Sequence, residues 1–224
     1  MLILSTLLLL ILTLVLGEVF SARLRQEGLQ SKMVKIYPEN KDFIRVDEVK
    51  KILQIRDSAS IDMSTFEANL EKNNYISKAE VYRDLNGNLV AEVTQYKPIA
   101  RVFGATSYYI DEQGEKRPLS HHYTENVVLV YGDVNQKQRK ILVAWLKQIY
   151  KDKLLNKIVS EIHIKSDRYS FKLKAFPANF ILNNTNYEEQ LYKLKNIYAY
   201  LKNHQLQNKY HQIDLRYSKQ VVCK

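Results

Sequence analysis

The sequence predicts an α+β protein with an N-terminal transmembrane helix, a first domain in the order β-α-α-β-β, and an antiparallel β-domain with flanking helices. Three observations predict this fold class. The first 16 residues contain no charge, Asn86-Gly87 separates two segments of alternating apolar and polar residues, and a helical period is followed by further alternating segments. We expect an anchor at 1–17, a linker at 18–32, a first domain at 33–103 and a second domain at 104–224.

The apolar N-terminal segment is the first expected element. About 16 helical residues extend about 24 Å, slightly less than the hydrocarbon core of a membrane. No Lys or Arg precedes the segment, as one would in a signal peptide, and Phe20 stands where cleavage after Ala22 would need a small residue. These residues leave both an uncleaved signal anchor and a cleaved signal peptide open at 1–17, and residues 18–32 are expected to form a polar linker.

The first domain is expected to contain two amphipathic helices. A strand at residues 34–37 precedes a helix whose apolar stripe includes Val49 and Leu53. A second, shorter helix places Phe66 and Leu70 four residues apart, on one face. Asp62 and Ser64 are the two candidates for its N-cap.

A β-hairpin follows these helices. Residues 79–84 and 89–94 alternate apolar and polar side chains, as half-buried strands do. Asn86 and Gly87 tolerate positive φ, which predicts a two-residue type I′ turn. Pro98 cannot donate a ladder hydrogen bond and is expected to end the second strand.

The second domain is expected to alternate strands with two long helices. Residues 108–114 suggest a strand and a D-x-x-G loop with Gly114 in the left-handed region, and Gly132 ends a buried strand. The remaining expected elements are a helix at 136–155, strands at 161–165, 169–175 and 180–182, a helix at 188–202 and a final strand at 213–222.

Two stretches resemble a known family. FEANLEKNNYISKAEVYRDLNGNLVAEVTQYKPIARV (residues 66–102) and IDLRYSKQVV (residues 213–222) are similar to sequences of the bacterial cell-division family FtsQ/DivIB. The resemblance implies a POTRA-like first domain, an FtsQ-type β-domain and a non-enzymatic scaffold of the division machinery that helps control septal cell-wall synthesis. It implies a single-pass inner-membrane protein with most of the chain in the periplasm at the septum, although the basic residues after the anchor would favour a cytoplasmic body.

The resemblance also implies a partner-binding edge. In the family, the partner FtsB adds a strand to the last strand of the β-domain, in complex with FtsL. Other divisome membrane proteins are further expected partners. The residues placed at this edge are Arg216, Tyr217, Ser218, Gln220 and Val221.

The positive charge is concentrated in one block. The chain carries a net charge of +10, and residues 136–174 contain 11 Lys/Arg against 3 Asp/Glu, a surplus of 8. An anionic neighbour is therefore expected. No pattern typical of a nucleic-acid-binding motif accompanies the lysines, so we expect anionic headgroups or an acidic protein rather than nucleic acid.

No residue pattern supports catalysis, and we expect no cofactor, metal or small-molecule substrate. His121 and His122 lack nearby ligands, and turn chemistry explains Asp111 and Glu112. Cys223 is the single cysteine and is expected as a small apolar residue in a terminal strand. Two alternatives remain open: a POTRA protein that receives unfolded polypeptide in outer-membrane assembly or secretion, and a membrane-anchored envelope enzyme.

Overall fold

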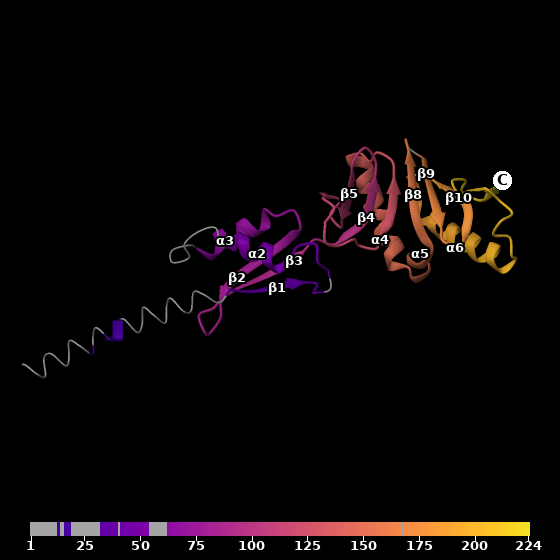
Figure 1. Ribbon diagram of the computed structural model, residues 1–224. Helices are drawn as coiled ribbons and strands as arrows, with labels where there is room; N and C mark the ends of the chain where they lie inside the picture. Colours follow the sequence, from indigo (N-terminus) through magenta and orange to yellow (C-terminus); the bar gives the residue numbers. More distant parts are fainter. Residues whose placement is uncertain (1–12, 14–15, 19–31, 40, 54–61, 167) are drawn as a thin grey trace, which may run out of the picture. The chain divides into compact units, whose positions relative to one another are not determined.

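The computed structural model is mixed α/β and contains two compact units, Met1–Tyr96 and Lys97–Lys224 (Figure 1). It describes residues 13, 16–18, 32–39, 41–53, 62–166 and 168–224. Each unit has its own hydrophobic core, as separate domains do.

The first unit is a three-stranded sheet with two helices on one face. Its elements are β1 (Lys32–Tyr37), α2 (Val46–Leu53), α3 (Met63–Glu71), β2 (Ile76–Arg83) and β3 (Leu89–Gln95). The strand order is β1-β3-β2, with β1 parallel and β2 antiparallel to β3. Val49 and Leu53 of α2, and Phe66 and Leu70 of α3, are buried against the sheet, because each helix repeats apolar residues at three- or four-residue spacing. Asp62, rather than Ser64, is the N-cap of α3.

The turn between β2 and β3 differs from the predicted one. Gly87 has φ of 83°, but Asn86 does not take positive φ, so the prediction of a two-residue type I′ turn was wrong. The Gly87 N–H donates to the Asp84 carbonyl at 3.0 Å, which closes a four-residue turn. The Asp84 carboxylate accepts from the N–H groups of Asn86 and Asn88 at 2.9 and 2.8 Å, and these bonds stabilise the longer loop.

The outer edge of β2 is covered by two glutamates of α3. Glu71 Oε1 accepts from the Ala79 N–H at 3.0 Å, and Glu67 Oε1 accepts from the Val81 N–H at 2.8 Å. These N–H groups lie on the side of β2 away from β3 and would otherwise be open to another strand. The helix thus protects this edge from pairing with another polypeptide.

The second unit is a nine-stranded sheet with three helices. Its elements are β4 (Pro98–Phe103), β5 (Ser107–Asp111), β6 (Lys116–Arg117), β7 (Val128–Tyr131), α4 (Gln136–Lys151), α5 (Lys153–Ile158), β8 (Val159–Lys165), β9 (Arg168–Leu173), β10 (Phe176–Leu182), α6 (Tyr187–Asn203), β11 (Gln212–Asp214) and β12 (Val222–Cys223). The strand order is β12-β11-β10-β9-β8-β7-β4-β5-β6. Residues 98–103, expected in the first domain, form β4 and belong to this sheet.

The expectation of an antiparallel second domain was wrong, because this sheet is mixed. β7 is parallel to β4 and to β8, and β11 is parallel to β10. The chain between the parallel strands β4 and β7 contains β5 and β6. Helices connect the other two parallel pairs: α4 and α5 connect β7 to β8, and α6 connects β10 to β11. A helical crossover returns the chain to the starting end of the sheet, so the next strand runs in the same direction.

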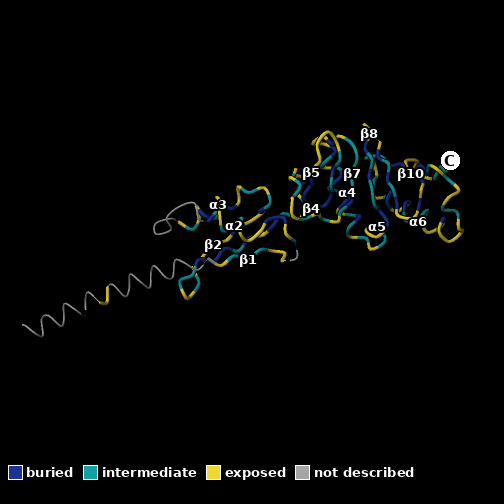
Figure 2. The backbone as a smooth tube through the Cα atoms, in the orientation of Figure 1, coloured by how far each residue is buried: buried dark blue, intermediate teal, exposed yellow. Residues whose placement is uncertain are grey.

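Helices α4 and α6 pack on the same face of the sheet. Trp145 of α4 is fully buried and contacts Tyr169 and Phe171 of β9 at ring-centroid distances of 4.7 and 5.1 Å. It also contacts Tyr187 of α6, at 6.3 Å. Figure 2 shows the central strands as mainly buried or partly buried, with exposed residues concentrated in the connections and at the ends.

The expected transmembrane helix also needs correction. Within the ranges that the structure describes, no helix is both long and apolar enough to cross a membrane. The described structure therefore does not support the membrane-spanning element of the predicted fold class. Residues 1–12, 14–15 and 19–31, which held most of the expected anchor and linker, lie outside the described residues.

Candidate functional site: the C-terminal sheet edge

The last residues of the chain form a hairpin rather than one strand. β11 ends at Asp214, residues 215–221 turn, and β12 pairs antiparallel with β11. The prediction of a single strand at 213–222 was therefore wrong. β11 has neighbours on both sides, and β12 is the outermost strand of the sheet.

The hydrogen-bond pattern of the hairpin determines which backbone groups face the open edge. Gln212 and Lys224 exchange both N–H to C=O bonds, at 2.9 and 3.1 Å. The next opposed pair, Ile213 and Cys223, is therefore non-hydrogen-bonded in the alternating pattern of an antiparallel ladder. The N–H and C=O of Cys223 consequently point away from β11, towards the edge of the sheet.

The position of Cys223 confirms the prediction of a small apolar residue in a terminal strand. It lies in β12 and packs, partly buried, against the core of the second unit. Burial raises the pKa of its thiol, which disfavours the thiolate. Its side chain is therefore a small apolar contact, and its backbone is what the edge presents.

An ion pair holds the start of the turn. Arg216 donates to both carboxylate oxygens of Asp214, from Nε at 2.9 Å and from a terminal guanidinium nitrogen at 2.7 Å. The side-chain hydrogen bonds from Arg216 hold the pKa of Asp214 below its usual value, against the opposing effect of burial. Since the Asp214 side chain is only 7% exposed, Arg216 has a structural role in addition to any contact with a partner.

The other predicted partner-binding residues lie in or beside the turn. Tyr217 is 46% exposed, and its carbonyl accepts from Lys193 Nζ of α6 at 2.7 Å. Ser218 and Gln220 are exposed, whereas Val221 is partly buried and packs against the core. The structure brings these residues together on one loop. It places none of them in a strand, and sequence reasoning did not identify Val222 and Cys223 as the edge because it assumed one continuous strand.

Two hollows of the second unit are the other candidate sites. One, of about 330 Å³, is lined by Gln148, Asp152, Leu155, Glu188, Leu191, Tyr192 and Lys195. Its carboxylate Asp152 pairs with Lys195 and also accepts from the N–H groups of Leu154 and Leu155 at 2.9 and 3.0 Å. These bonds give Asp152 a structural role, because it ends α4 and caps the start of α5.

The second hollow, of about 430 Å³, lies where β4 and β7 end. It is lined by Gly104, Ala105, Thr106, Tyr108, Lys116, Gly132, Asp133, Val134 and Asn135. Asp133 accepts from the Ala105 N–H at 3.0 Å, and Lys116 lies over the Tyr108 ring at 4.5 Å.

The histidines and carboxylates that the sequence analysis considered lie in different parts of the second unit. His121 and His122 are exposed in the connection before β7. Asp111 is fully buried in its turn, where its carboxylate accepts from Gln113 and Glu115 N–H groups and from Arg117 Nε at 2.8 Å. In the described parts of the chain, no group of three or more His, Cys, Asp or Glu residues is placed to hold a metal ion.

Comparison with known proteins identifies the second unit. The family described as "FtsQ/DivIB, C-terminal related" matches residues 97–224, more than half of the chain and the whole mixed sheet with its C-terminal hairpin. The chain belongs to this family. It is thus a cell-division protein of the FtsQ/DivIB type, and this membership favours a role in division over the two alternative functions.

The comparisons with curated proteins and with solved structures provide no further support for the family. No curated protein matches the chain. Among solved structures, it is similar to the major extracytoplasmic domain of the trans isomer of the cell-division protein DivIB from Geobacillus stearothermophilus, with 16% identity and a TM-score of 0.32 over 40% of this chain and 80% of that chain. At that TM-score, the likeness supports no argument. The assignment to the FtsQ/DivIB family therefore depends on the match to residues 97–224.

Proposed function

We propose that this FtsQ/DivIB-family protein is a non-enzymatic scaffold that binds FtsB- and FtsL-like division proteins by β-strand addition at its C-terminal edge. It helps to control septal cell-wall synthesis, and both folded units act in the periplasm at the septum. Other membrane proteins of the division machinery are further partners. The family match supports the division role, and the sheet edge supports strand addition as the physical means.

The observation that carries the proposal is the outward-facing backbone of Cys223. β12 is the last strand of the sheet, and its alternation with β11 directs the Cys223 N–H and C=O to the open side. A partner strand there gains main-chain hydrogen bonds and extends the nine-stranded sheet. This edge differs from that of β2, whose N–H groups are already bonded to Glu67 and Glu71.

The exposed turn beside β12 supplies side chains for selectivity. Tyr217 combines a large apolar ring with a polar end and is about half exposed. Such residues often dominate binding energy at interfaces. We therefore assign Tyr217 to the partner contact, with Ser218 and Gln220 at its margin and Val221 next to β12.

A proline substitution tests the backbone part of the proposal. Cys223→Pro removes the one N–H that faces the open edge, and it leaves the Gln212–Lys224 bonds in place. We expect binding of the full chain to the periplasmic part of its FtsB-like partner to fall at least about tenfold, while the urea unfolding midpoint changes little. Cys223→Ser retains the N–H and is the matched control.

Tyr217→Ala tests the side-chain part in the same assay. It should weaken binding about tenfold, whereas Tyr192→Ala, which truncates an even more exposed tyrosine on α6, should not. Arg216 is a poor probe, since its replacement would leave the nearly buried Asp214 carboxylate unpaired. Unchanged binding in both Cys223→Pro and Tyr217→Ala would refute strand addition at this edge.

A further inference from the structure

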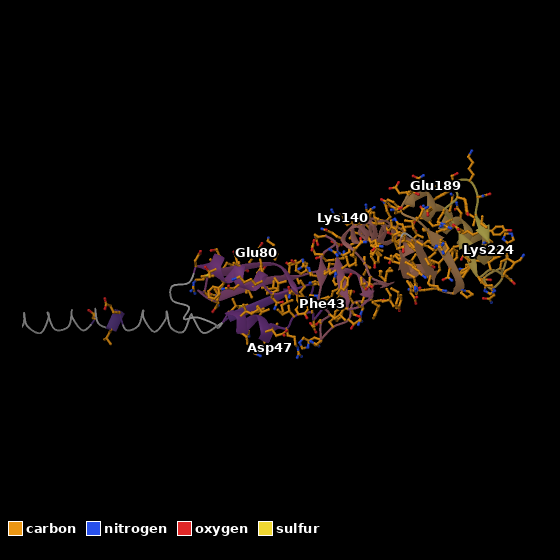
Figure 3. The ribbon with its side chains drawn as sticks, turned by 90° about the horizontal axis from the view of Figure 1, so that it is seen from above. Phe43, Asp47, Glu80, Lys140, Glu189 and Lys224 are labelled. Atoms are coloured by element: carbon orange, nitrogen blue, oxygen red, sulfur yellow. The ribbon has the colours of Figure 1, made fainter. Side chains whose placement is uncertain are left out.

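The outer face of α4 carries a row of four lysines. Lys137, Lys140, Lys147 and Lys151 are all exposed, and we call them the α4 lysine stripe. Figure 3 labels Lys140, which lies at the margin of the second unit in that view. At 1.5 Å per residue the stripe extends about 21 Å along the helix.

The stripe lies directly opposite the buried face of α4. At about 100° per residue, its four positions fall within a sector of about 80°. The buried residues of the helix, Gln138, Leu142, Trp145, Leu146 and Ile149, are centred on the opposite side. The same periodicity that packs α4 on the sheet thus gathers the lysines on one face of the helix that faces solvent.

The charge of the stripe is not neutralised within the described parts of the chain. None of its four lysines forms an ion pair there, and α4 contains no Asp or Glu. Asp152, directly after α4, is already paired with Lys195. Glu188 and Glu189 lie at the start of α6, where Lys193 pairs with Glu189 at 2.6 Å. Lys153 and Lys157 of α5 are also exposed and add to the positive charge beyond the end of the stripe.

The chemistry of the stripe indicates the kind of partner it fits. Lysine presents a mobile point charge, whereas recognition of individual carboxylates or phosphates favours the bidentate fork of arginine. The exposed large apolar residues of the described chain include none from α4, so the helix offers no aromatic ring for stacking on bases and no side chain to insert into a bilayer. A linear set of lysines with these properties fits an extended anionic surface.

We propose that the α4 lysine stripe binds an anionic lipid surface. The contact is peripheral and electrostatic, with the lysine side chains at the level of the headgroups. It requires no strand addition at β12 and is independent of partner binding. Because exposed charges are screened within about 8 Å at physiological ionic strength, the contact weakens steeply as salt increases.

Vesicle binding by the full chain tests this proposal. The partition coefficient is measured on vesicles of phosphatidylcholine alone and of phosphatidylcholine with phosphatidylglycerol, and the ratio of the two values isolates the electrostatic contribution. For the native chain we expect a ratio of at least about ten at low salt. In the variant with Lys137→Gln, Lys140→Gln, Lys147→Gln and Lys151→Gln, the ratio should fall to within about threefold of one.

A charge-matched variant provides the control. Lys174, Lys202, Lys209 and Lys219 are exposed lysines outside α4, and their replacement by Gln gives the same net charge. This control should retain most of the native ratio. An equal loss in both variants would assign the effect to net charge, and a native ratio near one would exclude lipid binding. Either result overturns the proposal.

Competition with a soluble anionic polymer separates lipid from an acidic protein. Poly-glutamate is added at the same total charge as the anionic vesicles. Lipid remains the partner if the native chain stays on the vesicles. If poly-glutamate removes the native chain and binds it through the same four lysines, the lipid proposal fails and the stripe is a site for acidic polypeptide.

Discussion

Asp84 and Asp111 perform the same structural task in two different units. Each carboxylate uses Oδ1 to accept hydrogen bonds from the N–H groups two and four residues later, at 2.8 to 3.0 Å. Each begins a D-x-x-G turn that ends in a glycine with φ near 85°, Gly87 at 83° and Gly114 at 86°. A side-chain acceptor and a left-handed glycine together close both hairpins.

Removal of the Asp111 carboxylate should strongly destabilise the second unit. Asp111 is fully buried, and its Oδ2 accepts from Arg117 Nε at 2.8 Å. Asp111→Ala leaves two N–H groups and one guanidinium without their acceptor, and we expect a loss of about 3 kcal/mol in the free energy of unfolding. Fluorescence of Trp145, the single tryptophan, reports this transition because its ring is buried in the same core.

Asp84→Ala is the matched comparison in the first unit. Asp84 is partly exposed, and its Oδ2 accepts from the neutral Asn88 amide rather than from an arginine. Water can replace the lost acceptor, so hydrogen exchange in β2 and β3 should indicate a loss of only about 1 kcal/mol. Equal losses in the two variants would show that burial and the Arg117 pair do not distinguish these turns.

Loss of the two edge glutamates should expose β2 to pairing. In the double variant Glu67→Ala and Glu71→Ala, the Val81 and Ala79 N–H groups lose their acceptors. We expect faster hydrogen exchange at both amides and concentration-dependent self-association in sedimentation experiments. The direct loss should be about 1 kcal/mol per bond.

Glutamine at the same two positions is the control. Its side-chain oxygen can still accept from the backbone, so Glu67→Gln with Glu71→Gln should self-associate no more than the native chain and retain slow exchange at Ala79 and Val81. A monomeric alanine variant with native exchange rates would show that α3 does not protect this edge.

The second unit should lose stability in acid as its paired aspartates become protonated. The pKa of Asp152 is lowered mainly by its hydrogen bond from Lys195, and the pKa of Asp214 is lowered mainly by Arg216. A carboxylate with a lower pKa in the folded state stabilises the fold above its unfolded pKa, near 4. This contribution disappears as pH falls through the lower, folded value.

Urea unfolding followed by Trp145 fluorescence measures this dependence. The midpoint should fall from pH 7 to pH 3 in the native chain, and by a smaller amount in Asp214→Asn, whose side chain does not titrate. The variant should also be less stable at pH 7, because the Arg216 pair is lost. If the urea midpoint of Asp214→Asn falls as much between pH 7 and pH 3 as that of the native chain, Asp214 does not contribute to the pH dependence of stability.

Local patterns predicted most helices and strands because those elements bury a periodic apolar face. The single helix expected at 136–155 was wrong, because Asp152 ends α4 and caps the separate helix α5. Phe66 and Leu70, or Leu142 and Trp145, need only their spacing to identify the buried side. The D-x-x-G loop with left-handed Gly114 was confirmed for the same reason, since the interactions that form it lie within five residues. The Asn86-Gly87 dipeptide was misleading because Asp84, two residues earlier, competes for the turn with its carboxylate.

Strand neighbours were less predictable. The directions of β8 and β11 depend on helical crossovers, and that of β7 depends on the path of the chain through β5 and β6. An alternating sequence looks the same in a parallel or an antiparallel pair. The edge was misplaced for a related reason. Residues 215–221 turn because Arg216 pairs with Asp214 and Lys193 of α6 holds the Tyr217 carbonyl, contacts that bring β12 back beside β11.

The sequence by itself therefore determined the apolar faces of the helices, the row of four lysines opposite the buried face of α4, the family resemblance and the surplus of positive charge. Those properties depend on neighbours within a few turns or a few strand residues. Only the tertiary structure decided that the sheet is mixed, that β12 rather than residues 213–222 forms the edge, and that the four lysines of α4 form no ion pair among the described residues. These features arise from pairings between distant segments, whose free energy depends on packing that no local pattern records.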